Sequence, residues 1–241
     1  MPSSTSTIAW NGWGSSPPSS GAGSSPGPRC ALGRMPLSLQ GKTGLFGGTF
    51  NPIHVGHLRV AEEAWRQFGL REVVFLPTGC PPHRAVDEGV SAEARYMMVR
   101  LAVAGHPGFT VSRFEVDRTG PCYTVDTVAA LKEVYRQGVA YIVGADIFAQ
   151  IETWRDWQRL LASCPFIVAP RPGVSAATFH RPPFDRAEVH FLKMPTISVS
   201  SSEVRRRYRE GLPTLGMVPP AVDRWIRTNG LYGVAPSPEG G

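Results

Sequence analysis

The chain has 241 residues, a net charge of +6 at pH 7 and a hydrophobic share of 42%. Its length suits one α/β domain or two small ones, and its composition is ordinary for a globular protein with a core. No apolar stretch reaches the roughly 20 residues that span a bilayer, and the four cysteines form neither a CxxC pair nor a Cys/His cluster with zinc spacing. We therefore expect no membrane segment, no disulfide framework and no protein-built metal site. The basic charge suits anionic partners without saying which.

Residues 1–40 are rich in Ser, Gly, Pro and Thr. This composition buries too little apolar surface to offset the entropy of ordering, so it predicts a disordered tail. The tail lacks the apolar core of a signal peptide and the isolated thiols suit a reducing compartment, which together predict a cytoplasmic protein. We interpret Trp10 and Trp13 as incidental aromatics rather than a partner-binding element. One folded domain is expected over residues 41–234, followed by a flexible end over 235–241.

From Thr43 onward, short apolar runs alternate with helical stretches. The runs that predict strands are Gly44–Phe46, Val73–Leu76, Tyr141–Val143, Phe166–Ala169 and Val189–Leu192. The helices predicted between them are His57–Phe68, Ala92–Ala104, Val125–Arg136 and Trp157–Ala162. This alternation predicts an α/β fold with a doubly wound, mostly parallel, Rossmann-like sheet, helices on both faces and a small C-terminal helical part. In such sheets ligands bind at the carboxyl ends of the strands, so the residues that follow the runs should converge on one edge.

The strongest motif, residues 47–57, reads GGTFNPIHVGH and follows the first predicted strand. Its two glycines let the backbone turn close to a ligand, and the next helix begins with N–H groups and a positive dipole end that together suit an anion. His54 and His57 lie on one side of the first turn and are expected to reach one phosphate. Gly56 keeps the space between them open. The alternative is a glycine turn with two solvent-exposed histidines.

Two further motifs lie in loops. Residues 77–84, PTGCPPHR, follow the second predicted strand and present His83 and Arg84, whose guanidinium fork suits a phosphate. The alternative is a surface loop with chance charges. The segment YTVDT, residues 123–127, stands at the start of a predicted helix, which Thr124 would alternatively only cap.

The last two motifs follow later strands. In Gly144-Ala145-Asp146 the carboxylate can accept two hydrogen bonds from ribose hydroxyls, or it only caps a helix; Trp154, eight residues on, is alternatively a core residue. In ISVSSSEVR, residues 197–205, Ser200 and Glu203 form a capping box that predicts a helix start. The N–H groups and hydroxyls of this start, with Arg205 one turn in, suit a triphosphate.

In this order the five motifs resemble those of the HxGH nucleotidyltransferase superfamily, and most closely the bacterial nicotinate-nucleotide adenylyltransferases. The resemblance covers about Thr43 to Gly233 and includes an LY element near the end. Two positions depart from the family pattern: Asn51 stands where the family usually has Asp, and Cys122 replaces the first Ser of SYTxDT. Asn51 argues against a metal held by a carboxylate of this loop.

The resemblance implies adenylyl transfer from ATP to nicotinate mononucleotide, giving deamido-NAD and pyrophosphate, as a step of NAD biosynthesis. It makes residues 41–234 a nucleotidyltransferase domain, with Mg²⁺ bound mainly through the ATP phosphates. The catalytic residues that it implies are His54, His57 and Arg205. The ATP-binding residues that it implies are Gly47, Gly48, Thr49, Phe50, His54, Gly56, His57, Gly144, Asp146, Ser200, Ser201, Ser202 and Arg205. The mononucleotide-binding residues that it implies are Thr78, His83, Arg84, Tyr123, Thr124, Trp154 and Arg171, with Trp154 stacking on the pyridine ring.

Several alternatives stay open. The acceptor is alternatively nicotinamide mononucleotide, if Asp126 or Glu152 turns inward to accept from its amide, or another phosphorylated acceptor of a sister adenylyltransferase. A class I aminoacyl-tRNA synthetase carries a similar signature, but this chain is short for one and lacks a KMSKS-like lysine loop. A nucleotide-sensing or nucleic-acid-binding protein would suit the basic charge. Basic aromatic stretches that stack single strands are not evident, so we expect no nucleic-acid partner. The sequence leaves homo-oligomerisation open.

Overall fold

The computed structural model describes residues 38–80 and 90–235. Their strands form one parallel sheet in the order β3-β2-β1-β4-β5-β6. The strands are β1 (Thr43–Gly48), β2 (Glu72–Pro77), β3 (Phe109–Val111), β4 (Val139–Gly144), β5 (Phe166–Ala169) and β6 (Val189–Phe191). The strand order reverses between β1 and β4, and this is the switch point at which doubly wound sheets bind their ligands. The predicted fold class and its five strands are confirmed, whereas β3 was not predicted.

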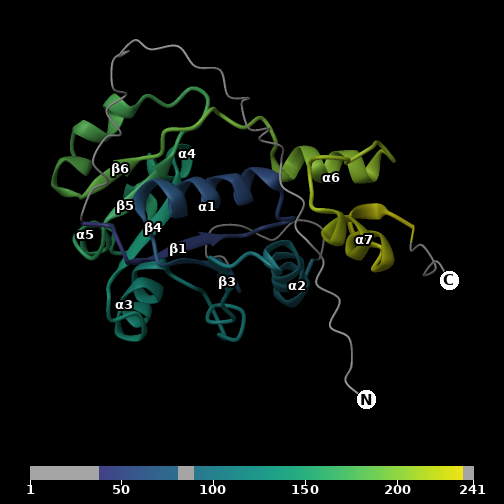
Figure 1. Ribbon diagram of the computed structural model, residues 1–241, viewed down its shortest axis with the longest axis horizontal. Coiled ribbons are helices and arrows are strands. Elements are labelled where there is room, and N and C mark those ends of the chain that lie inside the picture. Colours follow the sequence, from purple (N-terminus) through teal and green to yellow (C-terminus); the bar gives the residue numbers. More distant parts are fainter. Residues whose placement is uncertain (1–37, 81–89, 236–241) are drawn as a thin grey trace, which may run out of the picture. The chain divides into compact units, whose positions relative to one another are not determined.

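Seven α-helices accompany the sheet in the described part of the chain (Figure 1). They are α1 (Val55–Phe68), α2 (Ala92–Val103), α3 (Thr124–Val134), α4 (Ala145–Phe148), α5 (Trp157–Leu161), α6 (Ser201–Arg209) and α7 (Pro220–Thr228). The four predicted helices are α1, α2, α3 and α5, with ends within two residues of those expected. The short helices α6 and α7 lie together near one end of α1 in Figure 1 and form the predicted C-terminal helical part. None of the described helices has the length and apolarity to cross a membrane.

Side-chain alternation along the strands divides the core into two layers. On one face, Phe46 and Ile142 pack with α1, α2, α6 and α7; on the other face, Leu45 and Tyr141 pack with α3, α4 and α5. Because both faces are covered, the central strands read as continuous apolar runs, as parallel sheets require. The predicted domain start at residue 41 lies slightly too late: Leu39 is completely buried in the first layer, so the folded part already includes residues 38–40.

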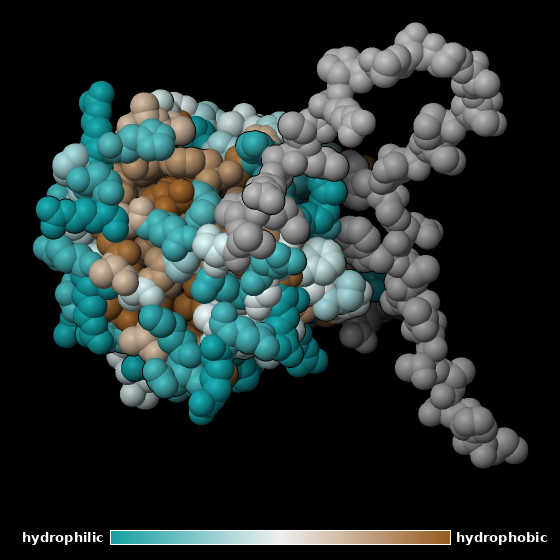
Figure 2. All heavy atoms as spheres, turned by 60° about the vertical axis from the view of Figure 1, so that its left-hand side comes forward, coloured by the Kyte–Doolittle hydropathy of each residue, from teal (hydrophilic) through white to brown (hydrophobic). Residues whose placement is uncertain are grey.

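The surface of the described part is mixed. On the face shown in Figure 2, apolar surface gathers in the middle and polar side chains border it. Large hydrophobic side chains that are exposed are Val134, Ile147, Leu212 and Leu215. Of these, Ile147 stands at the mouth of the cavity described next.

Candidate active site

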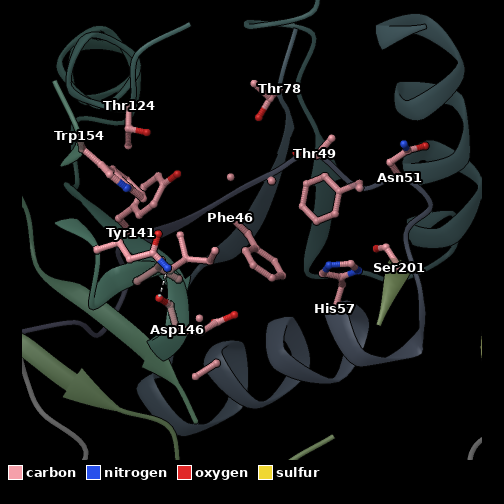
Figure 3. Close-up of a pocket in the computed structure, with 18 of the residues that line it drawn as sticks. Phe46, Thr49, Asn51, His57, Thr78, Thr124, Tyr141, Asp146, Trp154 and Ser201 are labelled. Carbon is pink, nitrogen blue, oxygen red and sulfur yellow. Dashed lines mark hydrogen bonds between the residues drawn. The ribbon is translucent and has the colours of Figure 1, made fainter. Parts of the chain in front are cut away.

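A cavity of about 780 Å³ opens at the switch point of the sheet. Its wall contains residues at the carboxyl ends of four strands: Gly48 ends β1, Thr78 follows β2, Gly144 ends β4 and Arg171 follows β5. Figure 3 shows two ends of this cavity, with Trp154, Tyr141 and Thr124 at one and His57, Asn51 and Ser201 at the other. The expected convergence of loops far apart in sequence is therefore present.

The glycines of the first motif are needed for close packing of the cavity wall. A Cβ at Gly47 would lie 2.2 Å from the hydroxyl oxygen of Tyr141, so only glycine fits there. Phe50, three residues further along, has φ +49°, a left-handed conformation that is unfavourable for an aromatic residue. Its ring packs edge-on to that of His57, with 5.0 Å between the centroids. Strained backbone held by packing is typical of ligand-binding loops.

His54 and His57 form a reciprocal cap at the start of α1. The backbone N–H of Gly56 donates to Nδ1 of His54 at 3.1 Å, and the backbone N–H of His54 donates to Nδ1 of His57 at 3.2 Å. The rings lie 3.8 Å apart, and a Cβ at Gly56 would come within 2.8 Å of the His54 ring. His57 lines the cavity, whereas His54 is only 2% exposed and lies behind it. The alternative of two solvent-exposed histidines is wrong.

Both histidines are neutral in the free protein. Burial, followed by the nearby positive charge of Arg171, lowers the pKa of His54 to about 3. Burial, followed by His54 and Arg171, also holds the pKa of His57 well below its usual value. Since Nδ1 of each ring accepts from a backbone N–H, the proton of each neutral ring lies on Nε2. His57 therefore offers the cavity a hydrogen-bond donor rather than a full positive charge.

The N-terminus of α6 is tied to the first motif by two side chains. Arg205 donates from Nη1 to the backbone oxygen of Asn51 at 2.8 Å, and Ser201 donates from its hydroxyl to the backbone oxygen of Pro52 at 3.0 Å. Ser200 accepts from the backbone N–H of Glu203 and caps the helix, but it does not line the cavity. The predicted capping box is only half formed, because the Glu203 carboxylate binds Arg206 and Arg207 instead.

Asp146 and Arg171 lie next to each other in the cavity wall. Arg171 Nε lies 3.4 Å from Asp146 Oδ1, and a Cβ at Gly144 would come within 2.7 Å of that oxygen. The capping alternative for Asp146 is wrong. The N-cap of α4 is Gly144, and no side chain makes a capping hydrogen bond at this helix start. The carboxylate is half exposed, so it remains accessible to a ligand.

The other end of the cavity is aromatic. The rings of Tyr141 and Trp154 meet edge-on with 6.3 Å between centroids, and the guanidinium of Arg155 lies 4.5 Å above the ring centre of Tyr123. Thr124 and Tyr141 both line this end of the cavity. Thr124 is the first residue of α3 and not its cap, so the capping alternative is wrong here too.

The sequence analysis missed several residues of the cavity wall, of which Glu115 and Tyr141 are the most informative. Glu115 is buried in the segment after β3, where its Oε1 accepts from the hydroxyl of Thr127 at 2.7 Å, and burial raises the pKa of its carboxyl. Tyr141 points from β4 into the cavity. Neither residue lies in a motif, and only the side-chain period of the strand could have indicated Tyr141.

The structure therefore brings most of the predicted site residues together. Those that line the cavity are Gly47, Gly48, Thr49, Phe50, His57, Thr78, Tyr123, Thr124, Gly144, Asp146, Trp154, Arg171, Ser201, Ser202 and Arg205. Those that support the wall without lining it are His54, Gly56 and Ser200. The predicted phosphate-binding pair His83 and Arg84 lies outside the described residues.

Comparisons with known proteins agree with this geometry. Residues 45–207 match the family model described as cytidylyltransferase-like. The probable nicotinate-nucleotide adenylyltransferase of Moorella thermoacetica is 42% identical over 203 residues, covering 81% of this chain and 94% of that protein. The protein of the same name from Saccharopolyspora erythraea is 41% identical over 197 residues, covering 81% and 92%. The solved Plasmodium falciparum nicotinic acid mononucleotide adenylyltransferase complexed with NaAD superimposes with a TM-score of 0.67 at 17% identity, covering 80% of this chain and 98% of that one.

Proposed function

The chain belongs to the nicotinate-nucleotide adenylyltransferase family, and we propose that it transfers the adenylyl group of ATP to nicotinate mononucleotide, giving deamido-NAD and pyrophosphate in NAD biosynthesis. One observation carries the proposal. A single cavity joins a donor-rich end at His57, Ser201 and Arg205 to an aromatic end at Trp154 and Tyr141. The first end suits phosphates and the second suits a pyridine ring, as a reaction between two nucleotides requires.

The chemistry requires positioning more than covalent participation. A phosphate oxygen of the mononucleotide attacks the α-phosphorus of ATP, and the bond between that phosphorus and the pyrophosphate oxygen breaks. The protein supplies in-line placement and hydrogen-bond donors for the developing charge. We propose that His57 donates from Nε2 to the phosphates, that Arg205 holds their far end, and that Asp146 accepts from ribose hydroxyls. His54 holds the His57 ring in place from behind, rather than touching the phosphates itself.

The remaining assignments are also proposals. Backbone groups of Gly47, Gly48, Thr49 and Phe50 face ATP, and Ser201 and Ser202 support its phosphates from α6. The mononucleotide is bound by Thr78, Tyr123, Thr124, Trp154 and Arg171, together with His83 and Arg84 of the segment that is not described. The cytoplasmic location expected from the sequence stays a prediction.

The donor set fits a magnesium ion that arrives with ATP. In residues 38–80 and 90–235, no three His, Cys, Asp or Glu side chains gather into a metal site. The phosphate end offers hydroxyls, an imidazole N–H and a guanidinium, all of which can donate to phosphate oxygens. Mg²⁺ commonly keeps several waters and binds through substrate phosphates, where it neutralises their charge. The hydroxyl oxygens of Ser201 and Ser202 have lone pairs, so these two side chains would be able to contact such an ion.

A panel of acceptors tests the proposal. Nicotinate mononucleotide, nicotinamide mononucleotide, phosphopantetheine and a buffer blank are incubated with ATP, Mg²⁺ and the full chain, and pyrophosphate release is measured. We expect the highest kcat/KM with nicotinate mononucleotide and deamido-NAD as the product in chromatography. A higher kcat/KM with phosphopantetheine, or no product with either pyridine mononucleotide, would overturn it.

A further inference from the structure

A completely buried arginine lies beneath the cavity. Arg95, in the first turns of α2, has no exposed surface. Its Nη1 donates to the backbone oxygen of Thr49 at 2.8 Å, and its Nη2 donates to the backbone oxygen of Gly79 at 3.1 Å. Thr49 belongs to the loop after β1 and Gly79 to the loop after β2. One planar guanidinium therefore fixes the distance between these two loops.

A buried carboxylate lies close to this bridge. Glu115 Oε1 accepts from the hydroxyl of Thr127, in the first turn of α3, at 2.7 Å. Burial has the largest effect on both groups: it lowers the pKa of the Arg95 guanidinium and raises the pKa of the Glu115 carboxyl, and the charge of each group offsets this only in part for the other. A Cβ at Gly79 would lie 2.0 Å from the backbone oxygen of Glu115. Only glycine at position 79 therefore lets this loop pack so close to the backbone of Glu115.

A charged bridge is a costly way to pack a helix against a sheet. Burying a guanidinium carries a desolvation penalty of several kcal/mol, and well-packed apolar residues often stabilise a core as well or better. A guanidinium, unlike an apolar side chain, can hold two backbone oxygens at a fixed distance and direction from each other. The loops that it joins carry Thr49 and Thr78, which line the cavity on the two sides assigned above to ATP and to the mononucleotide.

From these contacts we propose that Arg95 is a positioning residue that sets the separation between the two bound substrates; the proposal rests on the function proposed above. Arg95 touches neither substrate. It acts by holding the Thr49 loop and the Gly79 loop at the spacing that in-line attack requires. Loss of this bridge leaves each half of the cavity able to bind its own substrate, while a ligand that spans both halves no longer fits.

The test compares spanning and single-site ligands in Arg95→Lys. Lysine keeps the charge but offers one ammonium, which cannot reach both oxygens with the geometry of the fork. Dissociation constants are measured by calorimetry for deamido-NAD, for ATP alone and for nicotinate mononucleotide alone. We expect deamido-NAD affinity and kcat each to fall by about 10²-fold, and each single-substrate affinity to change by less than about threefold.

Two further variants separate positioning from stability. Val99→Ala removes buried volume from the same helix and leaves Arg95 and its two carbonyl partners unchanged in sequence, so it should lower the melting temperature and leave the ratio of spanning to single-site affinity unchanged. Gly79→Ala displaces the same carbonyl from the other side while Arg95 stays intact, so it should repeat the Arg95→Lys pattern.

Equal loss of all three affinities in Arg95→Lys, or no loss of any, would overturn the proposal. Failure of both Arg95→Lys and Gly79→Ala to give cooperatively unfolding proteins would overturn it too, because the bridge would then be a requirement of folding. The parent protein reports separately on the proposed function, since a parent that neither makes nor binds deamido-NAD contradicts that function whatever the variants do.

Discussion

The hydroxyl of Tyr232 donates to the side-chain oxygen of Asn51 at 2.6 Å, and both residues are buried. This bond joins the turn at Leu231–Gly233 to the loop of the first motif, 181 positions earlier. It gives Asn51 a structural role at the position where the resemblance leads one to expect an acid. An amide oxygen accepts from the tyrosine without bringing a negative charge toward the phosphates.

Removal of this bond should weaken the fold. Tyr232→Phe deletes the donor and keeps the ring, so we expect the free energy of unfolding to fall by about 1 kcal/mol. Urea denaturation of the variant and the parent measures the difference. Tyr96→Phe is the matched control, because it removes the same hydroxyl from a partly exposed tyrosine, whose ring packs against the guanidinium of Arg113. Equal stability of Tyr232→Phe and the parent would show that the bond contributes nothing.

The two donors assigned to the phosphates should be important for turnover. Loss of one donor aimed at developing charge commonly costs about 10²–10³ in kcat, and we expect this of His57→Ala and of Arg205→Ala. Steady-state kinetics at saturating ATP and mononucleotide measures the change, with circular dichroism as the check on folding. A folded variant within about threefold of the parent kcat would remove that residue from the mechanism.

The depressed pKa of His54 predicts how stability depends on pH. Its folded-state pKa of about 3 lies below the ordinary value of 6.5, so the unfolded chain takes up a proton first as the pH falls. The contribution of His54 is fully present above pH 6.5 and is lost as the pH falls from there toward the folded-state value.

His54→Asn tests this, because asparagine also caps helices but does not titrate. Between about pH 5 and pH 6 the parent should lose roughly 1 kcal/mol per pH unit more than the variant. Denaturation at several pH values in both proteins measures the difference in slope. Groups with the opposite tendency, such as Glu115 with its raised pKa, contribute equally to both proteins and cancel. Parallel slopes would show that His54 is not held neutral.

The aromatic end of the cavity predicts the choice of pyridine. Asp126 and Glu152 are exposed and do not line the cavity, so neither is placed to accept from the NH₂ group of nicotinamide. Glu115 does line it, and its Oε1 is bonded to the hydroxyl of Thr127. One buried amide group without an acceptor costs about 1–3 kcal/mol, so we expect at least about tenfold higher kcat/KM for nicotinate mononucleotide.

Competition between the two mononucleotides at limiting enzyme measures this preference. Equal use of both, or preference for the amide, would contradict the substrate assignment while leaving adenylyl transfer itself intact. Glu115→Gln is then the informative variant, because it tests whether this buried carboxylate is the acceptor.

The parts of the fold that the sequence predicts are those with long apolar runs. Four strands are buried on both faces and can be recognised in the sequence by their uninterrupted hydrophobic residues; these are β1, β2, β4 and β5. β3 has three residues at an edge of the sheet, of which only Phe109 is buried, so no run distinguishes it from a loop.

The site divides in the same way. Residues inside short motifs, such as His57 and Asp146, could be placed at the cavity from their position after a strand. The different tasks of His54 and His57 could not be predicted, because both residues stand at the same helix start. Only the capping bonds place the His54 ring behind the cavity wall. Arg95 and Glu115 give no local signal, because their partners lie in other segments.

The ties between α6 and the first motif affect the order in which the protein is made. A nascent chain that ends after β6 holds every strand of the sheet, yet it lacks Arg205 and Ser201, which bond the loop at Asn51 and Pro52. Such a chain can assemble the sheet on the ribosome but cannot complete the phosphate end of the cavity. Catalytic competence is therefore expected late in synthesis, after the final helices leave the exit tunnel, and incomplete translation products should be inactive even where their sheet has folded.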